Sequence, residues 1–226
     1  MKVLAVCGLM VLMLAAVAGC AAETSDPETT IAAQTTVGPA TTSTTRRQIG
    51  PSTTILSPEE LEPVVTPTLP AEIPGYVEVD PATGLHMTGT PQVIDVETYR
   101  LEVTGLVNKP LSLTYDELRL LPKIAASPNL LCPGFFVDGG TWSGASLAAV
   151  LDMAQVQAGA ESVSLVAADG YSISVDLVNA RAPDSFLAYE WNGEPLPALH
   201  GFPVRAVFPV KNGNFWVKWL IEIVVE

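Results

Sequence analysis

Residues 163–175 read VSLVAADGYSISV, and this stretch decides the class of fold. Apolar side chains recur at every second position on both sides of its centre, which is typical of strands with one buried face. Ala168-Asp169-Gly170 at the centre is a tight-turn sequence. The stretch therefore predicts a β-hairpin with strands over residues 163–167 and 171–175.

Strand patterns continue on both sides of this hairpin. Residues 99–107 alternate apolar and polar side chains and end at the turn Asn108-Lys109-Pro110. Residues 204–209 and 215–225 are rich in β-branched and aromatic side chains, so we expect two more strands there. The second half of the chain is therefore predicted to be mostly strand.

Two short segments predict helices. Thr114 is the N-cap of the first, Glu117 completes a capping box three residues later, and Pro122 stops the helix after about Leu121. Residues 145–155 carry one apolar helical stripe, expected to pack against a sheet and made of Leu147, Val150, Leu151 and Ala154. Short helices among strands of unequal length predict a mixed, strand-rich α+β domain.

Size and charge set limits on the class of protein. The chain has 226 residues, of which 48% are apolar, enough for one sizeable core. Its 11 basic and 24 acidic residues give a net charge of −13. This balance argues against a nucleic-acid partner, because phosphate backbones need a basic face. No run of 18 apolar residues follows residue 19, which argues against several membrane spans.

The N-terminus reads as an export signal. Lys2 precedes an apolar run, and Val17-Ala18-Gly19-Cys20 is a small-residue cleavage site that ends in cysteine. This site resembles the bacterial lipobox, which predicts a signal peptide over residues 1–19 and lipidation of Cys20. The alternative is an ordinary signal peptide with an incidental cysteine. A lipid on Cys20 would anchor the protein to the extracytoplasmic face of a bacterial membrane.

A spacer and one domain are expected after the signal. Residues 21–70 contain 13 Thr, 7 Pro and 4 Ser, a composition that buries too little apolar surface to fold. We therefore predict a disordered stalk over residues 20–70 and a folded domain over residues 71–226.

Cys132 is the first candidate for a functional residue. Cys7 lies in the signal and Cys20 is the predicted lipid site, so Cys132 is the remaining thiol of an exported chain. The motifs HExxH, GxSxG, CxxC, GxGxxG and the P-loop do not occur in the sequence. Carboxylates such as Asp138 and Asp169 form no pair by spacing and are expected on solvated faces or in turns. General rules thus leave Cys132 open as a buried small hydrophobe or a functional sulfur.

Longer sequence blocks narrow that choice. In order, they are NKPLSLTYDEL at 108–118, LCPG at 131–134, TWSGASL at 141–147, ADGYS at 168–172, LAYEWNGEPL at 187–196, HGFPVR at 200–205 and VKWL at 217–220. Together they resemble the sulfite-oxidase-type molybdopterin oxidoreductases over about residues 83–226. The resemblance implies the strand-rich sulfite oxidase fold with short helices, and a molybdenum–molybdopterin cofactor.

The resemblance also implies roles for individual residues. Cys132 matches the cysteine that supplies the protein thiolate to molybdenum, and a soft thiolate suits that metal. Arg205, also implied as catalytic, and Lys218 match positions that hold the cofactor, where cationic groups suit a phosphate. Further cofactor contacts are implied at His86, Asp169, Tyr171, His200 and Val217. Surface ion pairs remain the alternative for Arg205 and Lys218, as a structural histidine does for His86 and a plain hairpin turn for Asp169 and Tyr171.

A reaction follows from the implied cofactor. We expect two-electron oxygen-atom transfer on a small, sulfoxide-like oxide, with electrons exchanged through a separate partner linked to haem or quinone. Since no extra dimerisation domain follows Glu226, a monomer is expected. The sequence Met1-Lys2-Val3 lacks the paired arginines of the export route for folded, cofactor-loaded proteins. A metal-free binding or scaffold lipoprotein with the same fold is therefore an alternative, as is an unrelated adhesive lipoprotein.

Overall fold

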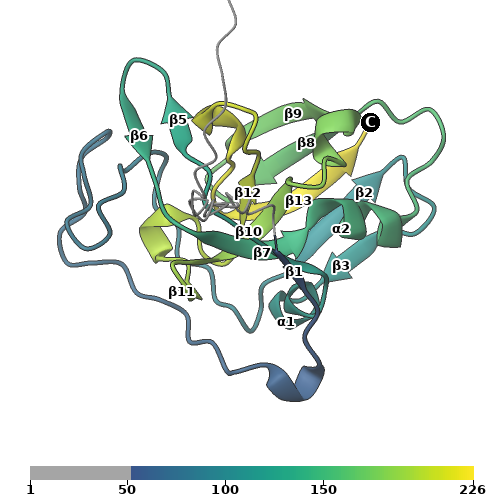
Figure 1. Ribbon diagram of the computed structural model, residues 1–226, viewed down its shortest axis with the longest axis horizontal. Coiled ribbons are helices and arrows are strands. Elements are labelled where there is room, and N and C mark those ends of the chain that lie inside the picture. Colours follow the sequence, from purple (N-terminus) through teal and green to yellow (C-terminus); the bar gives the residue numbers. More distant parts are fainter. Residues whose placement is uncertain (1–51) are drawn as a thin grey trace, which may run out of the picture. The chain divides into compact units, whose positions relative to one another are not determined.

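The computed structural model describes residues 52–226 (Figure 1). The predicted signal peptide, Cys20 and residues 21–51 of the predicted stalk lie outside the described residues. The larger sheet has the strand order β1-β4-β7-β10-β11, with β12 also paired to β10, and every pair is antiparallel. Its strands are β1 (Ser52–Thr54), β4 (Lys123–Ala126), β7 (Trp142–Ser146), β10 (Phe186–Trp191), β11 (Glu194–Pro195) and β12 (Arg205–Val207).

A second sheet has the order β3-β2-β13-β8-β9 and contains one parallel pair, β2 with β13. Its strands are β2 (Leu101–Gly105), β3 (Leu111–Leu113), β8 (Ser162–Ala167), β9 (Ser172–Asp176) and β13 (Leu220–Val225). The hairpin predicted over residues 163–175 is confirmed as β8 and β9. Its turn includes Gly170 at φ +87°, a left-handed conformation that glycine adopts without strain.

The two predicted helices are confirmed, with shorter bounds. α1 (Tyr115–Arg119) has the expected capping box, in which Thr114 Oγ1 accepts from Glu117 N–H and the Glu117 carboxylate accepts from Thr114 N–H. α2 (Leu147–Ala154) starts two residues later than predicted, because β7 extends to Ser146. The sequence did not indicate α3 (Leu177–Ala180) or the 3-10 turns at Pro58–Glu60, Ala198–His200 and Gly213–Phe215.

One hydrophobic core joins both large sheets to the helices. Leu101 of β2, Trp142 of β7 and Leu165 of β8 are all fully buried in it. The apolar stripe predicted on α2 is buried as expected, and α2 packs on β7 and β10. Each fully buried aliphatic side chain of this kind contributes about 2 kcal/mol to stability. Among residues 52–226 there is no helix with the length and apolar character needed to cross a bilayer.

Two sequence predictions need correction. The strand predicted over residues 215–225 begins only at Leu220, because Trp219 has a positive φ of 49° that interrupts extended backbone. The stalk predicted over residues 20–70 is wrong over residues 52–70, since β1 pairs with β4 and Val64 and Leu69 pack on buried apolar clusters. For residues 20–51 the stalk stays a prediction.

A small separate hairpin is formed by β5 (Leu130–Cys132) and β6 (Phe136–Asp138), seen beside the larger sheets in Figure 1. Its register pairs Leu130 with Asp138 and Cys132 with Phe136. Because side chains alternate between the two faces of a hairpin, these four residues share one face. That face borders the cavity described next.

Candidate functional site

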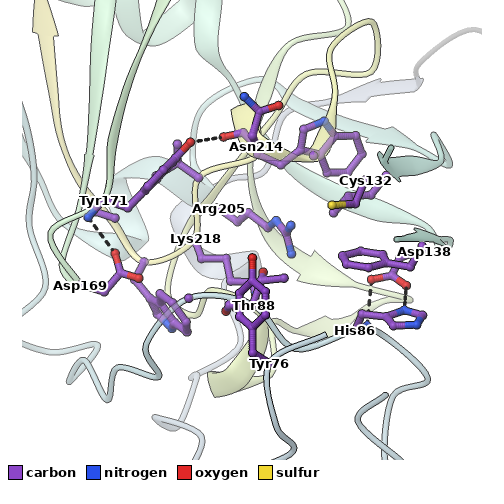
Figure 2. Close-up of a pocket in the computed structure, with 18 residues that line it drawn as sticks. Tyr76, His86, Thr88, Cys132, Asp138, Asp169, Tyr171, Arg205, Asn214 and Lys218 are labelled. Atoms are coloured by element: carbon purple, nitrogen blue, oxygen red, sulfur yellow. Dashed lines mark hydrogen bonds and ion pairs between the residues drawn. The ribbon is translucent and has the colours of Figure 1, made fainter. Parts of the chain in front are cut away.

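The site is a cavity of about 360 Å³, a volume suited to a small-molecule ligand (Figure 2). Four separate segments of the chain line it: residues 76–89, 130–138, 167–171 and 205–219. The site residues predicted from the sequence that line this cavity are His86, Cys132, Asp169, Tyr171, Arg205, Val217 and Lys218. Eight residues were predicted to bind the cofactor or its metal, and the fold brings seven of them together from distant parts of the chain.

Cys132 lies at the end of β5 with a partly exposed side chain. It forms no disulfide within residues 52–226. In this part of the chain no three His, Cys, Asp or Glu side chains gather as a metal site. A metal bound in the cavity would therefore take Cys132 as a single soft ligand and complete its coordination with other groups.

Arg205 projects from β12 into the cavity while remaining 4% exposed. Its guanidinium lies over two indole rings, 5.0 Å from the Trp142 centroid and 5.8 Å from the Trp216 centroid. Nη1 donates to the His200 carbonyl at 3.3 Å, whereas the buried Nε has no hydrogen-bond partner in the described structure. Burial lowers the pKa of Arg205 to about 10, although the charge of Asp138 acts against this shift, so the group is cationic at neutral pH.

Lys218 is the second basic group of the cavity and is also buried. Its Nζ donates to the carbonyl oxygens of Thr88 at 2.9 Å and Leu199 at 3.0 Å. Burial, together with the positive charge of Arg205, lowers the pKa of Lys218 well below its usual value. A negatively charged ligand in the cavity would favour the protonated form of this amine.

These features fit an anionic ligand. Among residues 52–226 neither Arg205 nor Lys218 forms a salt bridge, and the Nε donor of Arg205 is unused. Burying basic groups without a partner costs free energy, which a phosphate or similar anion would offset. The donor set of one thiol and two basic groups therefore suits a metal-bearing cofactor with a phosphate tail.

The β8–β9 turn forms part of the cavity wall and does more than reverse the chain. Asp169 Oδ1 accepts from Tyr171 N–H at 3.0 Å, and its Oδ2 accepts from Thr90 N–H at 3.2 Å. The Tyr171 hydroxyl donates to the Asn214 carbonyl at 2.9 Å, while burial, and then the charge of Asp169, raise the pKa of Tyr171. The turn thus joins two other segments that line the cavity, which a plain hairpin turn would not do.

His86 also lines the cavity, where it pairs with Asp138. Its Nδ1 lies 2.6 Å from Asp138 Oδ1, and its backbone N–H donates to Asp138 Oδ2 at 2.9 Å (Figure 2). The ring stacks on Phe136 with a centroid separation of 4.3 Å. Asp138 was expected on a solvated face or in a turn, but its side chain is 4% exposed, so that expectation is wrong.

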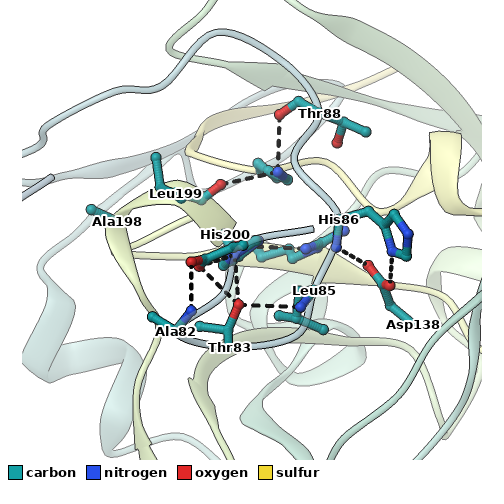
Figure 3. Close-up of polar contacts among 12 residues, drawn as sticks. Ala82, Thr83, Leu85, His86, Thr88, Asp138, Ala198, Leu199 and His200 are labelled. Carbon is teal, nitrogen blue, oxygen red and sulfur yellow. Dashed lines mark hydrogen bonds and ion pairs between the residues drawn. The ribbon is translucent and has the colours of Figure 1, made fainter. Parts of the chain in front are cut away.

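His200 does not line the cavity, in contrast to its predicted role as a cofactor contact. It is fully buried, with Nε2 at 2.9 Å from Asp80 Oδ2 and at 3.0 Å from Thr83 Oγ1 (Figure 3). Burial, and next the charge of Lys218, lower the pKa of His200 to about 4, so the imidazole is neutral at pH 7. It contributes to the site through its carbonyl oxygen, which accepts from Arg205.

Sequence reasoning missed several residues of the cavity wall: Tyr76, Thr88, Phe136, Asp138 and Asn214. They carry no local signal, because the fold brings them together from loops and from strand β6, which lie far apart in the sequence. Trp216 and Trp219 also line the cavity.

Comparisons with known proteins agree with this geometry. The model of the family described as oxidoreductase molybdopterin binding domain matches residues 86–226. An uncharacterised oxidoreductase, YuiH, from Bacillus subtilis is 34% identical over 139 residues, which cover 60% of this chain and 69% of the relative. The putative protein-methionine-sulfoxide reductase subunit YedZ1 of Azospira oryzae is 33% identical over 132 residues, covering 58% of this chain and 50% of the relative.

Sulfite oxidase of Arabidopsis thaliana is 33% identical over 174 residues, covering 60% of this chain and 44% of the enzyme. The chain thus spans about half, or less, of the last two relatives. Among solved structures, the sulfane dehydrogenase SoxCD of Paracoccus pantotrophus superposes with a TM-score of 0.57 at 22% identity, over 69% of this chain and 53% of that one. This structural similarity confirms the predicted mixed α+β fold.

Proposed function

Because the chain belongs to the family of oxidoreductases with a molybdopterin-binding domain, and so is a molybdenum-cofactor oxidoreductase, we propose that it catalyses oxygen-atom transfer to or from a small oxide. The observation that carries the proposal is the shared cavity of Cys132, Arg205 and Lys218. When bound, the molybdenum–molybdopterin group supplies two-electron oxygen-atom chemistry.

Different residues of the chain would bind different parts of this group. Cys132 would be the protein ligand of the metal, since within residues 52–226 it is the one thiol that borders the cavity. Arg205 and Lys218 would bind the phosphate tail, and the two indole rings beside Arg205 keep water away from its guanidinium. Asp169 and Tyr171 fix the opposite wall through their contacts with Thr90 and Asn214.

The surroundings of the cavity favour a neutral substrate over a dianion. Tyr76 and Tyr171 are exposed lining residues, and the neighbouring tip of the β5–β6 hairpin exposes Phe135. Arg205 and Lys218 are buried and assigned to the cofactor, and the lining that residues 52–226 provide holds no other lysine or arginine for a sulfite dianion. A sulfoxide-like oxide fits this surface, and the name of the relative from Azospira oryzae supports the same class of substrate.

The proposal also includes an electron partner and a location. We expect a separate redox partner, linked to haem or quinone, and a monomeric enzyme held at the extracytoplasmic face of a bacterial membrane by a lipid on Cys20. The lipobox-like sequence Val17-Ala18-Gly19-Cys20 supports the anchor. Fractionation of cells that produce the full chain tests it: the wild type should sediment with membranes, and a Cys20→Ala variant should not.

Metal analysis tests the function. The full chain, purified from cells supplied with molybdate, should contain about one molybdenum per chain if a single cofactor binds. It should also turn over small sulfoxides, N-oxides or sulfite with an artificial electron donor or acceptor. Cys132→Ser should lose the metal and the turnover. Leu131→Ser is the matched control, because Leu131 is the preceding residue of the same strand and is exposed on the other face of the hairpin. A wild-type chain without molybdenum would instead favour a metal-free binding protein with the same fold.

A further inference from the structure

Asp138 directs both of its carboxylate oxygens to one residue, His86. Oδ2 accepts from the backbone N–H of His86 at 2.9 Å, and Oδ1 lies 2.6 Å from its Nδ1 (Figure 3). The two residues are 52 positions apart in the sequence, and both line the cavity. A buried carboxylate with two hydrogen bonds to the same residue restrains both the backbone and the ring of that residue.

A second contact fixes the plane of the ring. The imidazole of His86 stacks on Phe136 with an interplanar angle of 6° and a centroid separation of 4.3 Å. Phe136 pairs with Cys132 in the β5–β6 register, and Asp138 is two residues further along β6. The small hairpin that carries the proposed metal ligand therefore also determines the position of His86.

The hydrogen bond determines which nitrogen carries the ring proton. An ionised carboxylate can only accept, so Nδ1 of His86 must be the donor in this pair. Nε2 forms no hydrogen bond with any other described residue. We propose that Asp138 is a positioning residue: in the neutral form of the His86 ring it keeps the proton on Nδ1 and leaves Nε2 as an acceptor for the group bound in the cavity.

The position of the ring proton on Nδ1 of His86 does not depend on the proposed function. The contribution of Nε2 to cofactor binding does rest on the proposed function. Burial lowers the pKa of both Arg205 and Lys218, and the charge of Asp138 partly opposes that fall. All three side chains line the same cavity. Replacing Asp138 by Asn keeps the size of the side chain and an oxygen acceptor for the His86 N–H. Its amide group, however, would donate toward Nδ1 and so favour the proton on Nε2.

Nitrogen NMR of the full chain labelled with ¹⁵N-histidine at pH 8 tests the tautomer directly. The chain has two histidines, so two pairs of ring signals are expected. His86 should show a protonated Nδ1 in the wild type and a protonated Nε2 in Asp138→Asn, while His200 should be the same in both. Asp152→Asn, at an exposed carboxylate, is the matched control and should leave His86 unchanged. A wild-type His86 with its proton on Nε2, or no change in Asp138→Asn, would overturn the proposal.

Molybdenum content tests the role in holding the cofactor. Loss of a partner that orients a binding side chain typically weakens binding by about tenfold or more, so Asp138→Asn should retain correspondingly less metal than the wild type. If Asp138 acts through His86, the double variant Asp138→Asn/His86→Gln should retain no less metal than His86→Gln alone. Independent, additive losses would refute action through His86. A wild type with the expected tautomer but no molybdenum would contradict the proposed function and leave the tautomer assignment standing.

Discussion

The two histidines of the chain each pair with an aspartate, but in different surroundings. His200 and Asp80 are both buried away from the cavity, whereas His86 lines the cavity with a side chain that is 23% exposed. In the buried pair Nε2 faces the carboxylate, and in the cavity pair Nδ1 does so. A histidine–aspartate pair thus stabilises the fold at His200, whereas the pair at His86 presents a ring nitrogen to the cavity.

The buried pair of His200 and Asp80 contacts two segments that lead into the cavity. Asp80 accepts from the backbone of Ala82 and the hydroxyl of Thr83, which closes the turn that leads into His86 (Figure 3). On the other side, the carbonyl of His200 accepts from Arg205. One pair therefore holds both the chain before His86 and the main cation of the cavity, so its loss should affect stability first and binding second.

The largest expected effect is that of replacing Arg205, which should change cofactor affinity and the free energy of unfolding in different ways. Arg205→Met removes a buried cation and replaces it with an unbranched apolar side chain that reaches about as far as the arginine Nε. Cofactor affinity should fall by about 4 kcal/mol, roughly a thousandfold, because the phosphate loses a charged, desolvated partner. The free energy of unfolding of the cofactor-free protein should stay equal or rise, since a buried charge is costly.

Molybdenum retention after gel filtration and urea unfolding of the cofactor-free chain measure these two effects. Arg181→Met is the matched control, because Arg181 pairs with Asp152 at the surface and does not line the cavity. Full metal retention by Arg205→Met would remove Arg205 from the proposed phosphate site.

The next effect concerns the buried pair and is a loss of stability in acid. The pKa of His200 is about 4 in the folded chain and about 6.5 when exposed, so the unfolded chain binds more protons between these values. The contribution of neutral His200 to the free energy of unfolding is therefore complete above pH 6.5. It is lost as the pH falls toward 4, by about 3 kcal/mol at most. Urea unfolding at several pH values should show a shallower decline in His200→Gln than in the wild type. Equal slopes would mean that His200 does not stay neutral in the fold.

Local patterns predicted those parts of the fold that depend on local physics. The hairpin over residues 163–175 followed from its period of two and its turn, and α1 followed from the capping box of Thr114 and Glu117. The strand predicted at residue 215 failed, since the apolar character of residues 215–219 is the same whether they extend a sheet or line a cavity. A positive φ at Trp219 is a tertiary outcome that the local pattern does not encode.

The site was predictable only where longer motifs existed. Cys132, Arg205 and Lys218 came from blocks that resemble a known family, and the structure places all three on one cavity. Asp80 and Asp138 had no such signal, because their partners lie 120 and 52 residues away. The motif around His200 marked the right segment, but a motif does not tell whether the side chain or the carbonyl oxygen serves the site.

The smallest expected effect compares two glycines on either side of His86. Gly84, in the turn that Asp80 closes, and Gly89, in the cavity wall, both have positive φ, of 77° and 73°. A Cβ at Gly84 would meet open space, so Gly84→Ala should cost about 1 kcal/mol from backbone strain alone. A Cβ at Gly89 would lie 2.9 Å from Asp169 and 2.9 Å from Trp219, so Gly89→Ala should cost about 1 kcal/mol more. Urea unfolding of both variants measures the difference, and equal losses would show that the cavity wall at Gly89 yields without cost.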